Sequence, residues 1–194
     1  MTVDPTSAGF FEAKYRADTD PWHFATDPYE LRRYATIVDA VGPEPFRRAF
    51  EPACSIGVLT AMLAPRCASL LATDASPSAV AAARARVVDR PPVEVVSMAL
   101  PEMPPGPFDL IVFSEVGYYF PPDPLADLVD DLITHLAPGG RLVAAHWTGQ
   151  SGDHVLDGAT VHRTIDRHPE LTSDIATRDE GGFLLGRWHR SVPR

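Results

Sequence analysis

The chain has 194 residues, 45% of them hydrophobic, which suits a single domain with a substantial apolar core. Its formal net charge of −9 disfavours binding to nucleic-acid phosphates. No segment reads as a signal peptide or membrane span, and the two cysteines, Cys54 and Cys67, match neither a zinc site nor a disulfide framework, so we expect a cytoplasmic protein without a metal.

The N-terminal part of the chain differs in character from the remainder. Residues 1–30 are polar with scattered aromatic side chains, and we interpret them as a short helix, a turn and the start of a second helix. The pair Asp27-Pro28 favours a helix entry, because aspartate caps a helix and proline suits its first turn. Residues 28–41 should continue as that helix.

From residue 46 onward, strands and helices are expected to alternate. The predicted strands are 47–52, 69–74, 93–97, 108–114 and 141–147, and the predicted helices are 57–63, 78–88, one from Asp123 to the stop at Pro138, and 154–168. Residues 171–190 predict two strands joined at Glu180-Gly181-Gly182. This order predicts a single α/β domain over residues 1–194, with a Rossmann-like, doubly wound, mostly parallel seven-stranded sheet and an antiparallel C-terminal hairpin.

The stretch 51–57, EPACSIG, follows the first predicted strand. Small residues at Ala53, Ser55 and Gly57 would let the backbone approach a ligand closely. The stretch lacks the G-x-G-x-x-G pattern of a pyrophosphate loop, and the acid Glu51 suits a ligand with a positive amino group. A plain strand-to-helix turn is the alternative interpretation.

Asp74 ends the second predicted strand, where a carboxylate can accept hydrogen bonds from both ribose hydroxyls of a nucleoside. The alternative is a helix cap, but Ser76-Pro77 already fills that role. After the third strand, the loop 97–101 could frame an adenine ring, although Met98 there could equally be ordinary packing.

Several strings resemble class I S-adenosylmethionine-dependent methyltransferases: EPACSIGVLTAMLA, LLATDASPSAVAAARAR, FDLIVFSEVGYYF and LAPGGRLVAAHW. With YRADTDPWHF and FLLGRWHR, the chain resembles more narrowly the NodS-like group, named for a nodulation N-methyltransferase that acts on de-N-acetylated chitooligosaccharides. The likeness covers nearly the whole chain. Ala53 departs from the pattern, which usually has glycine there.

The resemblance implies a class I methyltransferase fold, S-adenosylmethionine as cofactor and S-adenosylhomocysteine as product. Residues 1–45 would form a helical lid over the core 46–194. The implied cofactor contacts are Tyr15, Trp22 and Arg33 in the lid, Glu51, Ala53, Cys54, Ser55 and Gly57 around the methionine part, Asp74 and Ala75 at the ribose, Met98, Ala99 and Leu100 at the adenine, and Ser114 and Glu115 closing the site. We interpret the Cys54 side chain itself as packing.

Three residues at or after the ends of the fourth and fifth predicted strands are candidates for the chemistry. Glu115 and Tyr118 follow the buried fourth strand, where a carboxylate could bind an ammonium group and take its proton. His146 could serve as a base near neutral pH, or it could be a hydrogen-bonded core histidine.

The acceptor expected by analogy is an amino group of a sugar or similar small molecule. O-methylation of a hydroxylated natural product and a non-catalytic cofactor-binding protein remain alternatives. A nicotinamide oxidoreductase is disfavoured, because neither G-x-G-x-x-G nor Tyr-x-x-x-Lys occurs. No nucleic-acid or membrane partner is expected, and the protein could be a monomer or a homodimer.

Overall fold

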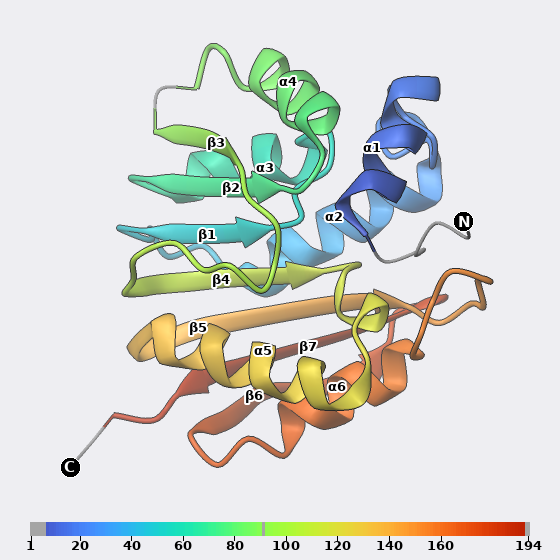
Figure 1. The fold of residues 1–194 in the computed structure, drawn as a ribbon. Coiled ribbons are helices and arrows are strands. Elements are labelled where there is room, and N and C mark those ends of the chain that lie inside the picture. Colours follow the sequence, from blue (N-terminus) through green and yellow to red (C-terminus); the bar gives the residue numbers. More distant parts are fainter. Residues whose placement is uncertain (1–6, 91, 193–194) are drawn as a thin grey trace.

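A computed structural model describes residues 7–90 and 92–192, whose strands form one continuous sheet (Figure 1). The helices are α1 (Ala8–Ala17), α2 (Pro28–Val41), α3 (Val58–Leu63), α4 (Pro77–Arg86), α5 (Pro122–His135) and α6 (Gly158–Asp166), with 3-10 turns η1 (Ala64–Arg66) and η2 (Gly117–Tyr119). The strands are β1 (Ala49–Pro52), β2 (Leu70–Asp74), β3 (Val93–Ser97), β4 (Phe108–Ser114), β5 (Leu136–Trp147), β6 (Leu171–Asp179) and β7 (Phe183–Arg190).

The sheet has seven strands in the order β3-β2-β1-β4-β5-β7-β6. Strands β1 to β5 pair in parallel, and β7 runs antiparallel to both β5 and β6. This arrangement confirms the predicted doubly wound sheet with its C-terminal hairpin. The strand order reverses between β1 and β4, and ligands of such sheets bind beyond the carboxyl ends of the strands at that point.

Helices cover both faces of the sheet. On β4, Leu110 and Val112 pack in the apolar cluster that includes α2 and α3, whereas Ile111 and Phe113 pack in the cluster that includes α5 and α6. Since alternate residues of a strand point to opposite faces, the two clusters lie on opposite sides of the sheet. Figure 1 shows α5 and α6 on the near side. The continuously apolar run of β4 follows from this double coverage.

Two predicted helices end differently in the structure. The helix expected to reach Pro138 ends at His135, because Leu136 already pairs with Phe108 in the sheet and its side chain is buried. The helix expected over 154–168 begins only at Gly158, where the Asp157 side chain accepts a hydrogen bond from the amide of Thr160. In both cases local tertiary pairing or capping overrides the periodicity.

Three arginines fix the C-terminal end of α2. Arg187 of β7 donates to the carbonyl of Ala40 and Arg141 of β5 to that of Val41. Arg66 of η1 donates to the carbonyl of Gly42. Cations there satisfy free carbonyls and complement the helix dipole.

Helix α2 is thus part of the core, as the complete burial of Ile37 and Val41 also shows. Residues 7–27, comprising α1 and the loop after it, lie instead over the carboxyl ends of the strands; we call them the cover segment. Among the described helices, none combines the length and apolarity needed to cross a membrane.

Candidate functional site

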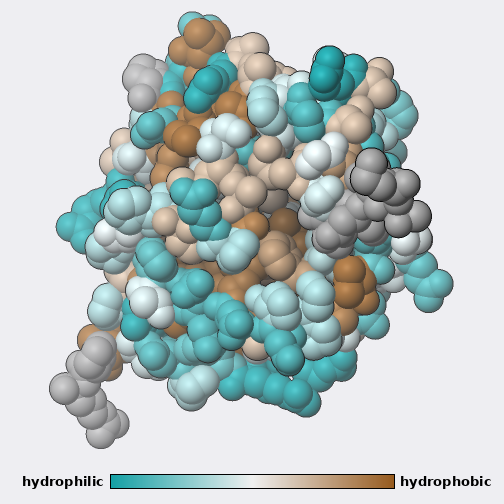
Figure 2. All heavy atoms as spheres, in the orientation of Figure 1, coloured by the Kyte–Doolittle hydropathy of each residue, from teal (hydrophilic) through white to brown (hydrophobic). Residues whose placement is uncertain are grey.

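A cavity of about 570 Å³ lies between the cover segment, the start of α2 and the carboxyl ends of the strands. Its lining from the N-terminal part is Ala8, Phe11, Tyr15, Trp22, Phe24, Tyr29, Glu30 and Arg33. Its lining from the strand ends includes Ala53, Ser55, Asp74, Ala75, Met98, Ala99, Leu100, Glu115, Tyr118, Tyr119, Trp147, Asp153 and His154. Figure 2 shows apolar residues set back in a hollow near the middle of the molecular face, surrounded by hydrophilic ones.

The loop after β1 brings its backbone to the cavity in an unusual conformation. Ala53 and Ser55 have positive φ angles of 55° and 52°, which side chains other than glycine rarely adopt. Gly57 has φ 76°, and a Cβ there would lie 2.9 Å from the Cβ of Ala83. Glu115 also has a positive φ, of 57°. Such strained residues gather at binding and catalytic sites, and three of them line this cavity.

Asp74 lies at the end of β2 with its carboxylate on the cavity. Oδ2 accepts from the amide of Ser55 and Oδ1 from that of Ser76, each at 2.9 Å. Burial raises the pKa of Asp74, and these two hydrogen bonds oppose the rise. The carboxylate is therefore fixed in direction, and each oxygen keeps a lone pair for a further donor such as a ribose hydroxyl.

Glu51 lies beneath this loop and outside the residues that line the cavity. Its side chain is buried, and its Oε2 has no hydrogen-bond partner. Burial raises the pKa of this carboxyl to about 8. Because buried polar atoms are nearly always hydrogen-bonded, the orphaned oxygen fits a donor supplied with a ligand, such as an ammonium group or a water bound to it.

Two sets of side-chain contacts join the cover segment to the segments that follow β1 and β2. The Tyr15 hydroxyl donates to Oγ of Ser55 at 2.5 Å. Glu12 accepts from the Ser76 hydroxyl at 2.6 Å and from the Ser78 hydroxyl and amide at 2.8 and 3.1 Å. The Glu12 contacts join α1 to the N-terminal end of α4, shortly after Asp74. Trp22 packs edge-on against Tyr15, with 5.5 Å between ring centroids.

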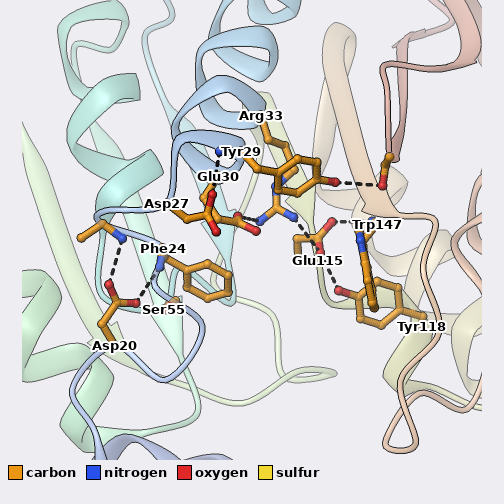
Figure 3. A network of polar contacts seen from close by, with 12 residues as sticks. Asp20, Phe24, Asp27, Tyr29, Glu30, Arg33, Ser55, Glu115, Tyr118 and Trp147 are labelled. Carbon is orange, nitrogen blue, oxygen red and sulfur yellow. Dashed lines mark hydrogen bonds and ion pairs between the residues drawn. The ribbon is translucent and has the colours of Figure 1, made fainter.

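A buried charged group forms the opposite wall; we call Glu30, Arg33, Glu115 and Tyr118 the acid cluster. Arg33 forms ion pairs with both carboxylates, reaching Oε2 of Glu115 at 3.1 Å. The Tyr118 hydroxyl donates to the same Oε2 at 2.7 Å, and the amide of Trp147 donates to Oε1 at 2.7 Å. Figure 3 shows the guanidinium of Arg33 lying between the two carboxylates.

The charges in the acid cluster are strongly coupled. Burial opposes ionisation of Arg33, but Glu115 and Glu30 outweigh it and raise the pKa of the guanidinium, which stays protonated. Burial raises the pKa of Glu115, while Arg33 and its two hydrogen-bond donors oppose the rise. Burial also raises the pKa of Glu30, to about 7, against the pull of Arg33.

His146 lies behind the cavity wall rather than on it. It is fully buried, its Nε2 accepts from the amide of Gly117 at 3.2 Å, and its ring contacts Phe113 and Tyr118. Burial lowers its pKa well below the usual value. This is the environment of a neutral core histidine, so the predicted role of His146 as a base has no support from its position.

The structure brings most of the predicted contacts to one cavity: Tyr15, Trp22, Arg33, Ala53, Ser55, Asp74, Ala75, Met98, Ala99, Leu100, Glu115 and Tyr118. The others lie outside its lining: Glu51, Cys54, Gly57, Ser114 and His146. Cys54 is a free, buried thiol in an apolar cluster, as its packing interpretation predicts. In the part of the chain that the structure describes, no group of histidine, cysteine and acidic residues could hold a metal ion.

Sequence reasoning missed several lining residues, among them the titratable side chains of Glu30 and His154. Glu30 precedes Arg33 by three positions on α2, and that spacing puts both on one helix face. The signal was therefore present for Glu30. His154 stacks on Tyr118 with ring centroids 3.8 Å apart, a contact between segments that no local pattern reveals.

Comparisons with known proteins point to one family. The family model Nodulation protein S (NodS) matches residues 10–159. Nodulation protein S of Sinorhizobium fredii (strain NBRC 101917 / NGR234) is 30% identical over 130 residues, which are 66% of this chain and 60% of that protein. The matched region thus spans less than two thirds of that relative's length.

Solved structures agree with that relation. N-methyltransferase NodS from Bradyrhizobium japonicum WM9, in complex with S-adenosylhomocysteine, is 26% identical with a TM-score of 0.83, covering 96% of this chain and 99% of that one. Magnesium protoporphyrin IX methyltransferase from Synechocystis PCC 6803, with bound S-adenosylmethionine, has a TM-score of 0.73 at 14% identity over 97% of this chain and 99% of that one. The latter likeness shows the fold alone.

Proposed function

The chain belongs to the Nodulation protein S family of S-adenosylmethionine-dependent methyltransferases, and we propose that it methylates an amino group of a small molecule such as an amino sugar. When bound, the cofactor supplies an electrophilic methyl group on a sulfonium centre. The protein has to hold the cofactor, place the amine behind that methyl and exclude water.

The cofactor's parts are assigned to the strand-end loops. The loop 51–57 would hold the methionine part, with the buried Glu51 carboxylate serving its ammonium group through the loop. Asp74 would hold the ribose hydroxyls, and the apolar surface of Met98–Leu100 would frame the adenine. The orphaned Oε2 of Glu51 and the fixed Asp74 carboxylate support this fit. Tyr15 and Trp22 of the cover segment would shield the site from water.

The charge of the cavity wall carries the proposal of an amine acceptor. Four carboxylates line the cavity: Glu30, Asp74, Glu115 and Asp153. Among the described lining residues, Arg33 is the single arginine or lysine. A cavity with excess negative charge attracts cations, which both the sulfonium cofactor and a protonated amine are. A neutral hydroxyl acceptor would gain nothing from this excess.

Two measurements test the proposal in sequence. Calorimetry with S-adenosylhomocysteine, with NAD as the control ligand, should show binding of the first alone. Transfer of a labelled methyl group is then measured with matched acceptor pairs, glucosamine against glucose and benzylamine against benzyl alcohol. We expect transfer to the amines; transfer to the alcohols alone would indicate O-methylation, and cofactor binding without any transfer would indicate a binding protein.

A further inference from the structure

We propose that Glu30, on the first turn of α2, is the residue that binds the acceptor's ammonium group and accepts its proton, whereas Glu115 is a positioning residue. This inference rests on the proposed function and assigns its acceptor site. The cavity carboxylates differ in how much of their hydrogen-bonding capacity is already used.

Both carboxylate oxygens of Glu115 already have hydrogen-bond donors. Oε1 accepts from the amide of Trp147, and Oε2 accepts from the Tyr118 hydroxyl and pairs with Arg33. These donors fix the direction of the carboxylate and favour its ionised form, against the burial that raises its pKa. Protonating Glu115 would break at least one of these contacts, so it is poorly placed to receive a proton from a substrate.

Glu30 is in the opposite situation. Within the described residues, Arg33 pairs with Oε2 of Glu30, and no other donor holds this carboxylate. Its side chain is 12% exposed and lines the cavity. Arg33 is shared with Glu115, so one positive charge faces two carboxylates. The acid cluster is neutral when Glu30 carries a proton and has a charge of −1 when it does not.

An ammonium group restores neutrality to the ionised cluster. The surroundings of Glu30 favour this exchange, since Glu115, Asp27 and Asp20 act against its ionisation and Arg33 acts for it. Burial places the pKa of Glu30 near 7, where a carboxylate exchanges protons most readily at cellular pH.

The proposed step is balanced. The ammonium gives one proton to Glu30, leaving a neutral amine and a carboxylic acid. The nitrogen lone pair then forms the new carbon–nitrogen bond as the bond from that carbon to sulfur breaks, and its electrons stay on sulfur. The product is a methylated ammonium and a neutral thioether.

The test uses the full chain and three variants: Glu30→Gln removes the acid, Glu30→Asp keeps it, and Asp39→Asn changes an exposed acid on the same helix. Calorimetry first confirms that each binds S-adenosylhomocysteine. Glucosamine and benzylamine are then titrated into the S-adenosylhomocysteine complexes between about pH 6 and 8, a range that spans the Glu30 pKa of about 7. Methyl transfer is measured over the same range.

For the unchanged protein, amine affinity should rise with pH through this range as Glu30 ionises. In Glu30→Gln we expect affinity to fall at least about tenfold and lose that rise, and kcat/KM to fall about 100-fold, as for a lost general base. Glu30→Asp should retain a pH-dependent profile, and Asp39→Asn should match the unchanged protein.

A flat pH profile in the unchanged protein, or a normal profile in Glu30→Gln, overturns the assignment. So does a failure of both amines to bind to the S-adenosylhomocysteine complex. A failure of S-adenosylhomocysteine itself to bind would instead overturn the proposed function. The two failures are therefore distinguishable.

Discussion

Nε2 of His146 lies 3.2 Å from the amide nitrogen of Gly117 and accepts its hydrogen bond. The ring proton must then sit on Nδ1, which lies 3.3 Å from Nε2 of His162. Nδ1 of His162 in turn lies 3.1 Å from Oγ1 of Thr177, to which it donates. The two rings thus form a directed, neutral pair that supports η2, the turn carrying Tyr118 to the acid cluster.

This histidine pair should make the protein sensitive to acid. Burial lowers the pKa of His162 to about 4, from about 6.5 in an unfolded chain. The unfolded state therefore binds more protons than the folded state between these two pH values. The contribution of His162 to the free energy of unfolding is complete above about pH 6.5 and is lost as pH drops towards 4. His162→Gln should remove roughly 3 kcal/mol of that decline, measured by urea unfolding at several pH values. An unchanged slope, or an equal effect of His135→Gln, would contradict the role of the pair.

Asp74→Ala should weaken binding of S-adenosylhomocysteine at least about tenfold, from lost ribose hydrogen bonds of about 1.5–3 kcal/mol. Calorimetry measures the affinity, with the exposed Asp89→Ala as the matched control. Because Asp74 also accepts from the amides of Ser55 and Ser76, the melting temperature without ligand must be compared too. Unaltered affinity would remove Asp74 from the ribose site.

Glu51→Gln should have opposite effects on stability and on binding. Burial raises the pKa of Glu51 to about 8, from about 4.5 in an unfolded chain, so its contribution to the free energy of unfolding falls as pH rises between these values. At pH 8 the amide should therefore raise the melting temperature of the ligand-free protein by a few degrees, as an effect of about 1 kcal/mol does. The same variant should weaken S-adenosylhomocysteine binding. If the variant lowers both the melting temperature and the affinity for S-adenosylhomocysteine, the carboxylate has a purely structural role.

Glu12→Gln should loosen the cover segment. The Glu12 carboxylate accepts hydrogen bonds from Ser76 and Ser78, and these bonds lower its pKa, so the charged form is the one that holds α1 in place. We expect faster tryptic cleavage after Lys14 and Arg16 and faster release of S-adenosylhomocysteine, each by several-fold, with little change in global unfolding. Equal cleavage rates in the two proteins would place the anchoring of α1 elsewhere.

The fold was largely predictable because local signals agreed with one another. Proline and serine caps, the apolar run of β4 and the glycine turn at 181–182 each mark an element that the structure contains. The family prediction, which depended on motifs at strand ends, is also confirmed by the family model and the curated relative. The boundary near Leu136 is decided by sheet pairing with Phe108, which the local periodicity does not show. The start at Gly158 is decided by the Asp157 cap, which the periodicity of residues 154–168 did not reveal.

The placement of a residue at the cavity was predictable where one segment decides it, and not where two segments meet. The loop 51–57 and Asp74 follow their strands directly, so their placement at the sheet edge follows from topology. Glu30 gains its character from burial and from sharing Arg33 with Glu115, a residue of a different element. His146 became a core residue because α6 packs over it, which the strand pattern alone does not indicate.

The arginine-fixed end of α2 has a consequence for turnover. Glu30 and Arg33 stand on a helix anchored to β5, β7 and η1, whereas Tyr15 and Trp22 stand on the cover segment. Product exchange can therefore proceed by displacing α1 and its loop while the acidic wall keeps its geometry and charge. Each catalytic cycle would then begin with the charged wall of the site already assembled. The slow conformational step would be displacement of the cover segment, not re-formation of the binding site.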